Sequence, residues 1–253
     1  MQLDGLAAIV TGGASGLGFA TARMLVEHGA LVTILDLGES RVQDAAGQIR
    51  ALGLTCDVAD DEAAESALTK AKERHGPARV VINCAGIAPA QRVISRKGPM
   101  PLEDFERVIR VNLIGSFNLL RLGAADMVDL EPNEEGERGV VINTASIAAY
   151  EGQIGQIAYA ASKAGVVGMT LPAARDLARH GIRVVSIAPG LIATPLLLNM
   201  PENVQDSLAK TVPFPSRFGK PEEYAALVKH IINNPLLNGE TLRLDGALRM
   251  APQ

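Results

Sequence analysis

Three side chains in the middle of the chain have the chemistry needed to move a proton: Ser146, Tyr159 and Lys163. Tyr159 and Lys163 are four positions apart, so in a helix they lie on the same face. A free phenol has a pKa of about 10, which is too high for acid–base work near neutral pH. A neighbouring ammonium group favours the phenolate and lowers that pKa. Tyr159 is therefore a candidate general acid and base, supported by Lys163 and Ser146.

A glycine-rich stretch near the N-terminus predicts a binding site for a dinucleotide. The run Ala7–Thr11 has the composition of a short buried strand, and an apolar pattern of helical spacing then extends to about His28. Between them, glycines without Cβ atoms would let backbone N–H groups and the helix N-terminus approach a pyrophosphate. A tight turn that binds nothing is the alternative. The residues that we expect around the pyrophosphate are Gly12, Ser15, Gly16, Leu17 and Gly18.

Asp36 ends the next candidate strand, Leu31–Asp36, and predicts which dinucleotide binds. It stands 24 positions after Gly12, close to the spacing of the ribose-binding acid in dinucleotide folds. A carboxylate there accepts hydrogen bonds from both ribose hydroxyls and repels a 2′-phosphate. The next residue is Leu37 rather than a cation, which favours NAD over NADP, although Arg41 is near enough in sequence to keep NADP open. A turn carboxylate without a ligand is the other interpretation of Asp36.

Two further candidate strands, Leu54–Val58 and Arg79–Ala85, should end at the same edge of the sheet. Ligands of open α/β sheets bind beyond the carboxyl ends of the strands. The residues at these two ends that we expect to contact the cofactor are Asp57, Val58, Asn83, Ala85 and Gly86. For Asp57, capping the next helix, Asp60–His75, is nearly as good an explanation.

The second half of the chain supplies the elements around the proton-transfer residues. Leu102–Met127 has the pattern of one long amphipathic helix, and Asn112 within it is either a satisfied core amide or a functional group. Gly139–Ala145 is a candidate strand that delivers Ser146 at its end. The helix that follows is rich in alanine and glycine, which suits close packing against another subunit. Pro172 should kink or divide that helix.

Two segments could border a substrate. The loop Ile87–Pro101 is long and carries a cluster of cations, which is either solvated or faces an anionic substrate: Arg92, Arg96 and Lys97. After the candidate strand Ile182–Ala188, a segment at about residues 190–215 includes the apolar run Leu196–Leu198. We expect this segment to be a flexible lid, with a helix packed into the core as the alternative. A last helix, Pro221–Asn233, and a last strand, Glu240–Asp245, complete the chain.

Composition narrows the class of protein. The chain has 253 residues, 47% of them apolar, and a formal net charge of −4, which gives no support to nucleic-acid or anionic-membrane binding. No apolar run reaches the roughly 18 residues of a transmembrane helix. No targeting segment is visible before the first apolar run, so we expect a cytoplasmic protein. The histidines and cysteines have no metal-ligand spacing, so we expect no metal site.

The alternation of strands and helices predicts one α/β domain, residues 1–253, with a Rossmann-type doubly wound sheet of about seven parallel strands. Its N-terminal half would bind the dinucleotide.

These motifs together resemble the short-chain dehydrogenase/reductase (SDR) family. They are T-G-x-x-x-G-x-G at 11–18, N-x-A-G at 83–86, Asn112, Ser146, Y-x-x-x-K at 159–163 and P-G at 189–190. The glycine spacing is that of the classical branch, and the resemblance covers essentially the whole chain. Cys84 departs from the asparagine that is commoner at its position in the family.

The resemblance implies a role for each motif. Tyr159 would take the proton of a substrate hydroxyl while hydride leaves for the nicotinamide. Lys163 would lower the pKa of Tyr159 and bind the nicotinamide ribose, Ser146 would hold the substrate oxygen, and Asn112 would position a water for proton relay. The resemblance adds Pro189, Gly190 and Thr194 to the cofactor site. Gln153 and Gln156 are further candidates for contact with the substrate.

Longer stretches, among them V-P-F-P-S-R-F-G and L-N-G-E-T-L-R-L-D-G, are similar to family members that oxidise 3-hydroxyacyl-CoA esters and also accept steroids. This resemblance implies NAD as the cofactor, a homotetramer and an acyl-CoA substrate. A steroid, another secondary alcohol or a 3-oxoacyl carrier-protein ester remains an alternative substrate. A non-catalytic, NAD-binding scaffold is the alternative outside enzymes.

Overall fold

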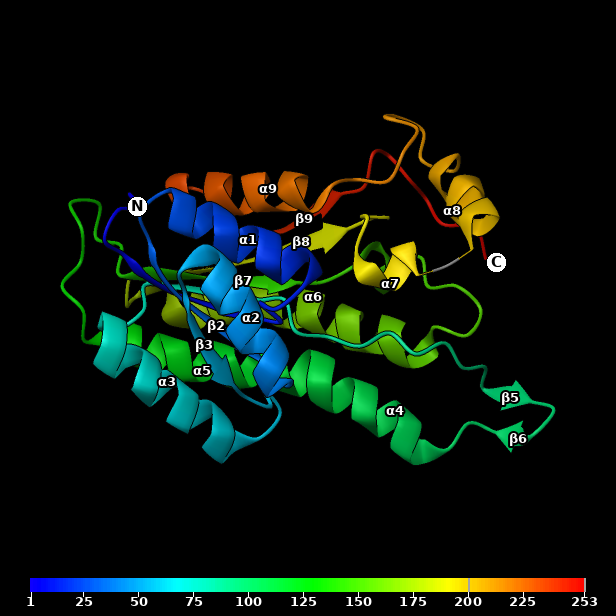
Figure 1. The fold of residues 1–253 in the computed structure, drawn as a ribbon, viewed down its shortest axis with the longest axis horizontal. Helices are drawn as coiled ribbons and strands as arrows, with labels where there is room; N and C mark the ends of the chain where they lie inside the picture. Colours follow the sequence, from blue (N-terminus) through cyan, green and yellow to red (C-terminus); the bar gives the residue numbers. More distant parts are fainter. Residues whose placement is uncertain (200, 253) are drawn as a thin grey trace.

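The computed structural model describes residues 1–199 and 201–252 and has three layers, with helices on both faces of a parallel sheet (Figure 1). The seven strands lie in the order β3-β2-β1-β4-β7-β8-β9. Their bounds are β1 Ala7–Thr11, β2 Leu31–Asp36, β3 Leu52–Thr55, β4 Val80–Asn83, β7 Gly139–Thr144, β8 Ile182–Pro189 and β9 Thr241–Leu244. The chain order reverses between β1 and β4, and in such sheets ligands bind at that reversal. The predicted doubly wound fold is confirmed.

The central strands β1, β4, β7 and β8 bury side chains on both faces, as strands of parallel sheets do. In β1, Ala8 and Val10 belong to one apolar cluster and Ala7 and Ile9 to the other, because side chains alternate along a strand. The first cluster packs under α1 Gly16–Glu27, α2 Glu39–Ile49 and α9 Pro221–Asn233. The second packs under α3 Asp61–His75, α5 Gly115–Val128 and α6 Ile157–Ala178.

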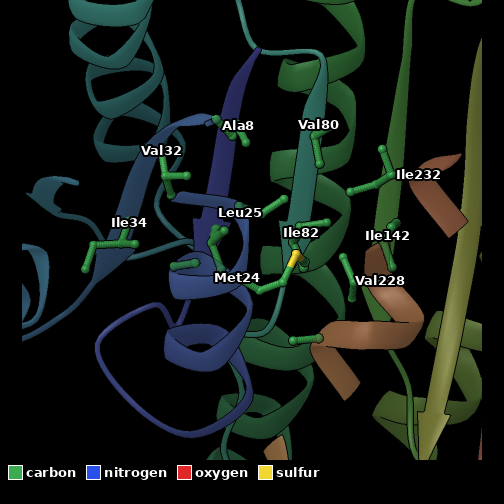
Figure 2. Packing of buried hydrophobic residues seen from close by; sticks show 14 of the residues in the cluster. Ala8, Met24, Leu25, Val32, Ile34, Val80, Ile82, Ile142, Val228 and Ile232 are labelled. Atoms are coloured by element: carbon green, nitrogen blue, oxygen red, sulfur yellow. The ribbon is translucent and has the colours of Figure 1, made fainter. Parts of the chain in front are cut away.

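Figure 2 shows the first cluster, in which Leu25 of α1 and Val228 of α9 pack against Ile82 and Ile142 of the central strands. All four side chains are fully buried. Burial of one such aliphatic side chain contributes about 1.5–3 kcal/mol. This packing holds the carboxyl ends of β1, β4 and β7 at one edge, where the candidate site lies.

The third strand begins and ends earlier than the sequence predicts. It covers Leu52–Thr55 rather than Leu54–Val58, because Arg50 adopts a left-handed conformation (φ 59°) that ends α2. Gly53 then packs against α2, where an added Cβ would lie 2.8 Å from the Val42 carbonyl oxygen. The chain can therefore enter the sheet before the more apolar run. Asp57 and Val58 follow the strand instead of ending it.

Two helices also differ from expectation. The predicted helix Leu102–Met127 is α4 Leu102–Ile109 and α5, joined by a π-helical turn, Arg110–Ile114, that contains Asn112. Pro172 does not divide its helix, because α6 runs through it unbroken. Pro172 has no N–H to donate to the Gly168 carbonyl, and both residues are exposed, so water can reach this part of the helix.

The two predicted border segments contain short elements. Ile87–Pro101 forms a hairpin of β5 Ile94–Ser95 and β6 Gly98–Pro99 that projects from the body (Figure 1). The segment at about 190–215, whose role as a lid stays a prediction, holds α7 Pro195–Leu198 and α8 Glu202–Ala209. Helix α8 has no buried residue, so it does not pack into the core. Residue 200 of this segment lies outside the described residues.

The loop 131–138, between α5 and β7, is acidic in composition but not wholly exposed. Glu137 is buried and its Oε1 accepts a hydrogen bond of 2.7 Å from Nε of Arg183, which is buried on β8. The Arg183 guanidinium also donates to the carbonyls at the end of α9, including that of Ile231 at 2.9 Å.

No described helix is both long and apolar enough to cross a membrane.

Candidate active site

The three proton-transfer residues come together at the carboxyl edge of the sheet. Ser146 follows β7, and its Oγ accepts a hydrogen bond from the Ala148 backbone N–H at 3.1 Å. Tyr159 and Lys163 come from the first two turns of α6, one turn apart. The Tyr159 phenol is hydrogen-bonded to Ser146. A substrate oxygen beside the Ser146 hydroxyl would therefore also lie beside the Tyr159 phenol.

Lys163 is the buried cation of this group. Its Nζ donates to the Thr144 carbonyl at 2.6 Å and lies 5.8 Å from the centroid of the Tyr159 ring. Burial lowers the pKa of Lys163 to about 8, an effect opposed by the nearby Cys84 thiol. The ammonium charge is thus fully present only below that pH.

The phenol does not have the lowered pKa that the sequence predicts. Burial raises the pKa of Tyr159, and the hydrogen bond from Ser146 offsets this only in part. The physical reason is that the Lys163 ammonium is directed at the Thr144 carbonyl rather than at the phenol oxygen. In this geometry Tyr159 therefore rests as the neutral phenol, the form that donates a proton.

Asn112 is a fully buried and well-bonded amide. Its Oδ1 accepts from the Ile87 N–H at 2.8 Å, and its Nδ2 donates to the Ile87 carbonyl at 2.9 Å and to Ser162 Oγ at 3.0 Å. An added Cβ at Gly86 would lie 3.2 Å from Asn112 Oδ1 and 3.6 Å from Lys163 Nζ. Asn112 thus borders the same small space as Lys163, and its role in proton relay stays a prediction.

Glycine is required in the loop for a different steric reason at each position. Gly12 has a φ of 62°, and an added Cβ would lie 2.8 Å from the Ala85 backbone nitrogen, so only glycine lets the loop touch the end of β4. An added Cβ at Gly18 would overlap the Gly12 carbonyl. Gly16 has a φ of 52° and lies opposite Thr194. An added Cβ at Gly16 would lie 3.4 Å from Thr194 Cγ2.

The first turn of α1 is open to an anion. Ser15 is its N-cap, and the serine side chain makes no capping hydrogen bond. Leu17 is the second residue of the helix, and its side chain is half-buried against the core. Free backbone N–H groups at a helix N-terminus, with close approach permitted by glycine, are what a pyrophosphate requires. These residues fit a bound dinucleotide.

Asp36 closes the other side of this loop. Its Oδ2 accepts from the Ala14 N–H at 3.2 Å, and its Oδ1 accepts from the Leu37 N–H at 2.9 Å. Arg41 donates to Oδ1 at 2.8 Å. The carboxylate is thus placed where a ribose would follow the pyrophosphate, and it already has a cationic partner.

The other predicted cofactor residues differ in how exposed their side chains are. Asp57 Oδ1 accepts from the Ala59 N–H, whereas Asp60, not Asp57, caps α3 through Ala63. Val58 is buried in the core. The Asn83 amide is also buried and donates to Asn143 Oδ1 and to the Ser116 carbonyl, so its side chain ties β4 to β7.

Thr11 is a residue that sequence reasoning did not assign to the site. Its Oγ1 accepts from the backbone N–H groups of Cys84 at 3.1 Å and Ala85 at 3.0 Å, which fixes the turn after β4 beside the glycine loop. Thr11 directly precedes Gly12 and Gly13, and this position was the sequence signal that could have assigned it to the site.

The last cofactor candidates lie at the end of β8 and just beyond it. Pro189 is the final residue of that strand, and Gly190 packs against Asp245, where an added Cβ would lie 2.8 Å from Asp245 Cβ. Thr194 lies opposite Gly16. The chain after β8 therefore crosses over the glycine loop.

Gln153 and Gln156 are engaged within the protein. Gln153 Nε2 donates to the Ala251 carbonyl at 3.0 Å, and Gln156 Oε1 accepts from the Gln153 N–H at 3.0 Å. The segment is further held by Glu151, whose carboxylate pairs with Arg243 at 2.9 Å. These bonds tie the segment to the C-terminal tail, and contact with a substrate stays a prediction.

A groove of about 440 Å³ lies between this segment and the base of the hairpin. It is lined by residues 91–93, by residues 152–157 and by Ala160. The Gln91 N–H donates to the Gly155 carbonyl at 2.7 Å, which joins the two walls of the groove.

Within the described residues, no cluster of His, Cys, Asp and Glu side chains is placed to hold a metal ion.

The glycine cradle, the acid at the end of β2 and the Ser–Tyr–Lys group lie along one edge of a seven-stranded parallel sheet. A family model described as short chain dehydrogenase matches residues 6–205. The chain belongs to the short-chain dehydrogenase family. It is therefore an oxidoreductase that uses a nicotinamide cofactor, and the family predicted from the sequence motifs is confirmed.

Several similar short-chain dehydrogenases share one name. It is 56% identical to "3-hydroxyacyl-CoA dehydrogenase type-2" of Bos taurus over 99% of this chain and 98% of that protein. It is 55% identical to the Homo sapiens protein of the same name, with the same coverage. The crystal structure of 3-hydroxyacyl-CoA dehydrogenase type-2 from Mycobacterium avium is 43% identical and superposes with a TM-score of 0.94, covering 98% of both chains.

Proposed function

We propose that this short-chain dehydrogenase interconverts 3-hydroxyacyl-CoA and 3-oxoacyl-CoA esters with NAD(H). The observation that carries the proposal is identity of 56% over almost the whole length to a relative with that activity in its name. The grouping of Ser146, Tyr159 and Lys163 at one edge supports catalysis rather than a scaffold role. Reduction of acetoacetyl-CoA by NADH tests it.

Each residue has a task in that reaction. The bound nicotinamide supplies the hydride donor or acceptor. In the reductive direction, Tyr159 donates its proton to the 3-oxo oxygen, and its raised pKa keeps that proton available at neutral pH. The Ser146 hydroxyl donates a hydrogen bond to the same oxygen, where negative charge develops. Lys163 would hold the nicotinamide ribose, and its positive charge would stabilise the phenolate that Tyr159 becomes after it donates its proton.

In the oxidative direction, Tyr159 must first lose its proton. An ammonium that turned from the Thr144 carbonyl toward the phenol would lower the pKa of Tyr159. Each pKa unit corresponds to about 1.4 kcal/mol, so lowering it by two or three units is within the reach of one buried charge. Asn112, which borders Lys163, would position a water that passes the proton to solvent.

The choice of NAD rests on Asp36. Its carboxylate ends β2 beside the glycine loop, where it would accept hydrogen bonds from the adenosine ribose. A single acid at this position disfavours a 2′-phosphate by charge repulsion. Asp57, Val58 and Ala85 would border the adenine and its ribose.

The hairpin supports coenzyme A as the carrier of the acyl group. Arg92, Arg96 and Lys97 are all exposed on it, and Arg92 lines the groove of about 440 Å³. Coenzyme A carries several phosphate charges far from its thioester. Cations on a projecting hairpin would meet them while the thioester reaches Tyr159.

Replacing Arg92, Arg96 and Lys97 by alanine should raise the KM for acetoacetyl-CoA about tenfold, since three exposed ion pairs contribute about 0.2–1 kcal/mol each. The KM for acetoacetyl-N-acetylcysteamine, which has the thioester without the nucleotide, should not change. Steady-state kinetics with both substrates measures this. The variant with Lys70 and Arg74 of α3 replaced by alanine is the control. An equal change for both substrates would contradict the assignment.

We also propose a homotetramer. On α6, Ile157 and Leu171 are 46% and 44% exposed, and Phe117 at the start of α5 is 51% exposed. The small residues of α6 that are exposed with them would allow another helix to approach closely: Ala161, Ala164 and Gly168. Apolar side chains exposed together on neighbouring helices are typical of an interface.

A further inference from the structure

Arg41 holds an unusual place for a residue beside a ribose-binding acid. It lies in the first turn of α2, and its guanidinium donates to Asp36 Oδ1 at 2.8 Å. The Asp36 side chain is 11% exposed and that of Arg41 is 60% exposed, so the cation covers the carboxylate from the solvent side.

The Asp36 carboxylate is almost saturated before any ligand binds. Oδ1 accepts from Leu37 and Arg41, and Oδ2 accepts from Ala14. A carboxylate offers about four acceptor positions. A ribose with two free hydroxyls needs two of them, so Arg41 must give up its position when NAD is held by both hydroxyls.

The same pairing changes the charge that a 2′-phosphate would meet. Alone, Asp36 would repel that group, which carries about −1.5 to −2 at pH 7. With Arg41 beside it, the pair is neutral, and the exposed guanidinium keeps further N–H donors in a fork that suits phosphate oxygens. Moving from the carboxylate to a phosphate would require only a turn of an exposed side chain.

We propose that Arg41 is a specificity-determining residue that gives this dehydrogenase measurable affinity for NADP(H), by neutralising Asp36 and binding the 2′-phosphate. The inference rests on the proposed use of NAD(H), in which Asp36 binds the unphosphorylated ribose. NADH remains the tighter ligand, because Asp36 stays at the end of β2.

Fluorescence titration with NADH and NADPH tests this without any acyl substrate. Arg41→Gln should weaken NADPH binding about tenfold and change NADH binding less than threefold. Arg41→Lys should keep part of the NADPH affinity. Arg74→Gln, which removes an exposed cation from the last turn of α3, is the control for net charge and should change neither. NADPH binding should also weaken more than NADH binding as salt rises, because exposed charges are screened.

Two results would overturn the role of Arg41: an unchanged ratio of the NADPH and NADH dissociation constants in Arg41→Gln, or no NADPH binding by the unaltered protein. Either can occur while NADH still binds tightly, which leaves the proposed function intact. Tighter binding of NADPH than of NADH by the unaltered protein would instead contradict the proposed use of NAD.

Discussion

Replacing Tyr159 by phenylalanine should lower kcat by about three orders of magnitude, in the range by which positioned acid–base groups accelerate reactions. The substitution removes the hydroxyl that bonds to Ser146 and keeps the ring that packs beside Lys163. NADH affinity should stay within about threefold, because the glycine loop and Asp36 are untouched. Turnover of acetoacetyl-CoA and NADH titration, measured on the same preparation, check both halves of the expectation.

Tyr150→Phe is the matched control for this variant. Tyr150 is 49% exposed and its ring stacks on Arg243 at 5.3 Å, a contact that phenylalanine preserves. It should keep nearly full activity. If Tyr159→Phe retained a rate near that of the unaltered enzyme, proton transfer would have to come from another group.

Gly18→Ala should weaken NADH binding by about 10- to 100-fold. The new methyl group would overlap the Gly12 carbonyl and lie 3.1 Å from Gly13 Cα, so the loop must open where the pyrophosphate would bind. Overpacking of this kind costs about 1–3 kcal/mol, and each 1.4 kcal/mol is tenfold in affinity. NADH titration measures the loss, and thermal melts show whether the fold persists.

Gly47→Ala provides the comparison. Gly47 is an exposed glycine in α2, and an added Cβ there meets no atom within 4 Å. NADH binding should not change, and the protein should gain about 0.5–1 kcal/mol of stability from the better helix former. Equal NADH affinity in a folded Gly18→Ala and in Gly47→Ala would show that the glycine loop does not hold the cofactor.

The parts of the site that sequence predicts well are those set by periodicity and by strand ends. Tyr159 and Lys163 share a helix face because they are four apart, and Ser146 follows a strand that is buried on both sides. The alternation of strands and helices predicts that the strands of the sheet are parallel, because parallel strands need crossover connections such as helices. Local spacing carries this information without knowledge of distant contacts.

The parts that sequence misses depend on what lies next to a residue in space. The Thr144 carbonyl draws the Lys163 ammonium away from the phenol, and burial then raises the pKa of Tyr159. The partner of Asp36 is a side chain on the next helix, and Gly53 enters the sheet because α2 leaves room only for glycine. Whether α6 continues through Pro172 likewise depends on the side of the helix on which the proline lies, and here that side is exposed to solvent.

The proposed activity is tested most directly by following NADH absorbance with acetoacetyl-CoA as substrate. We predict saturable oxidation of NADH with formation of 3-hydroxybutyryl-CoA, about 1,000-fold slower in Tyr159→Phe. The kcat/KM should exceed that for acetoacetyl-N-acetylcysteamine and for a panel of ketosteroids. No turnover of acetoacetyl-CoA by enzyme that binds NADH, or a higher kcat/KM with a ketosteroid, would contradict the assignment of an acyl-CoA substrate.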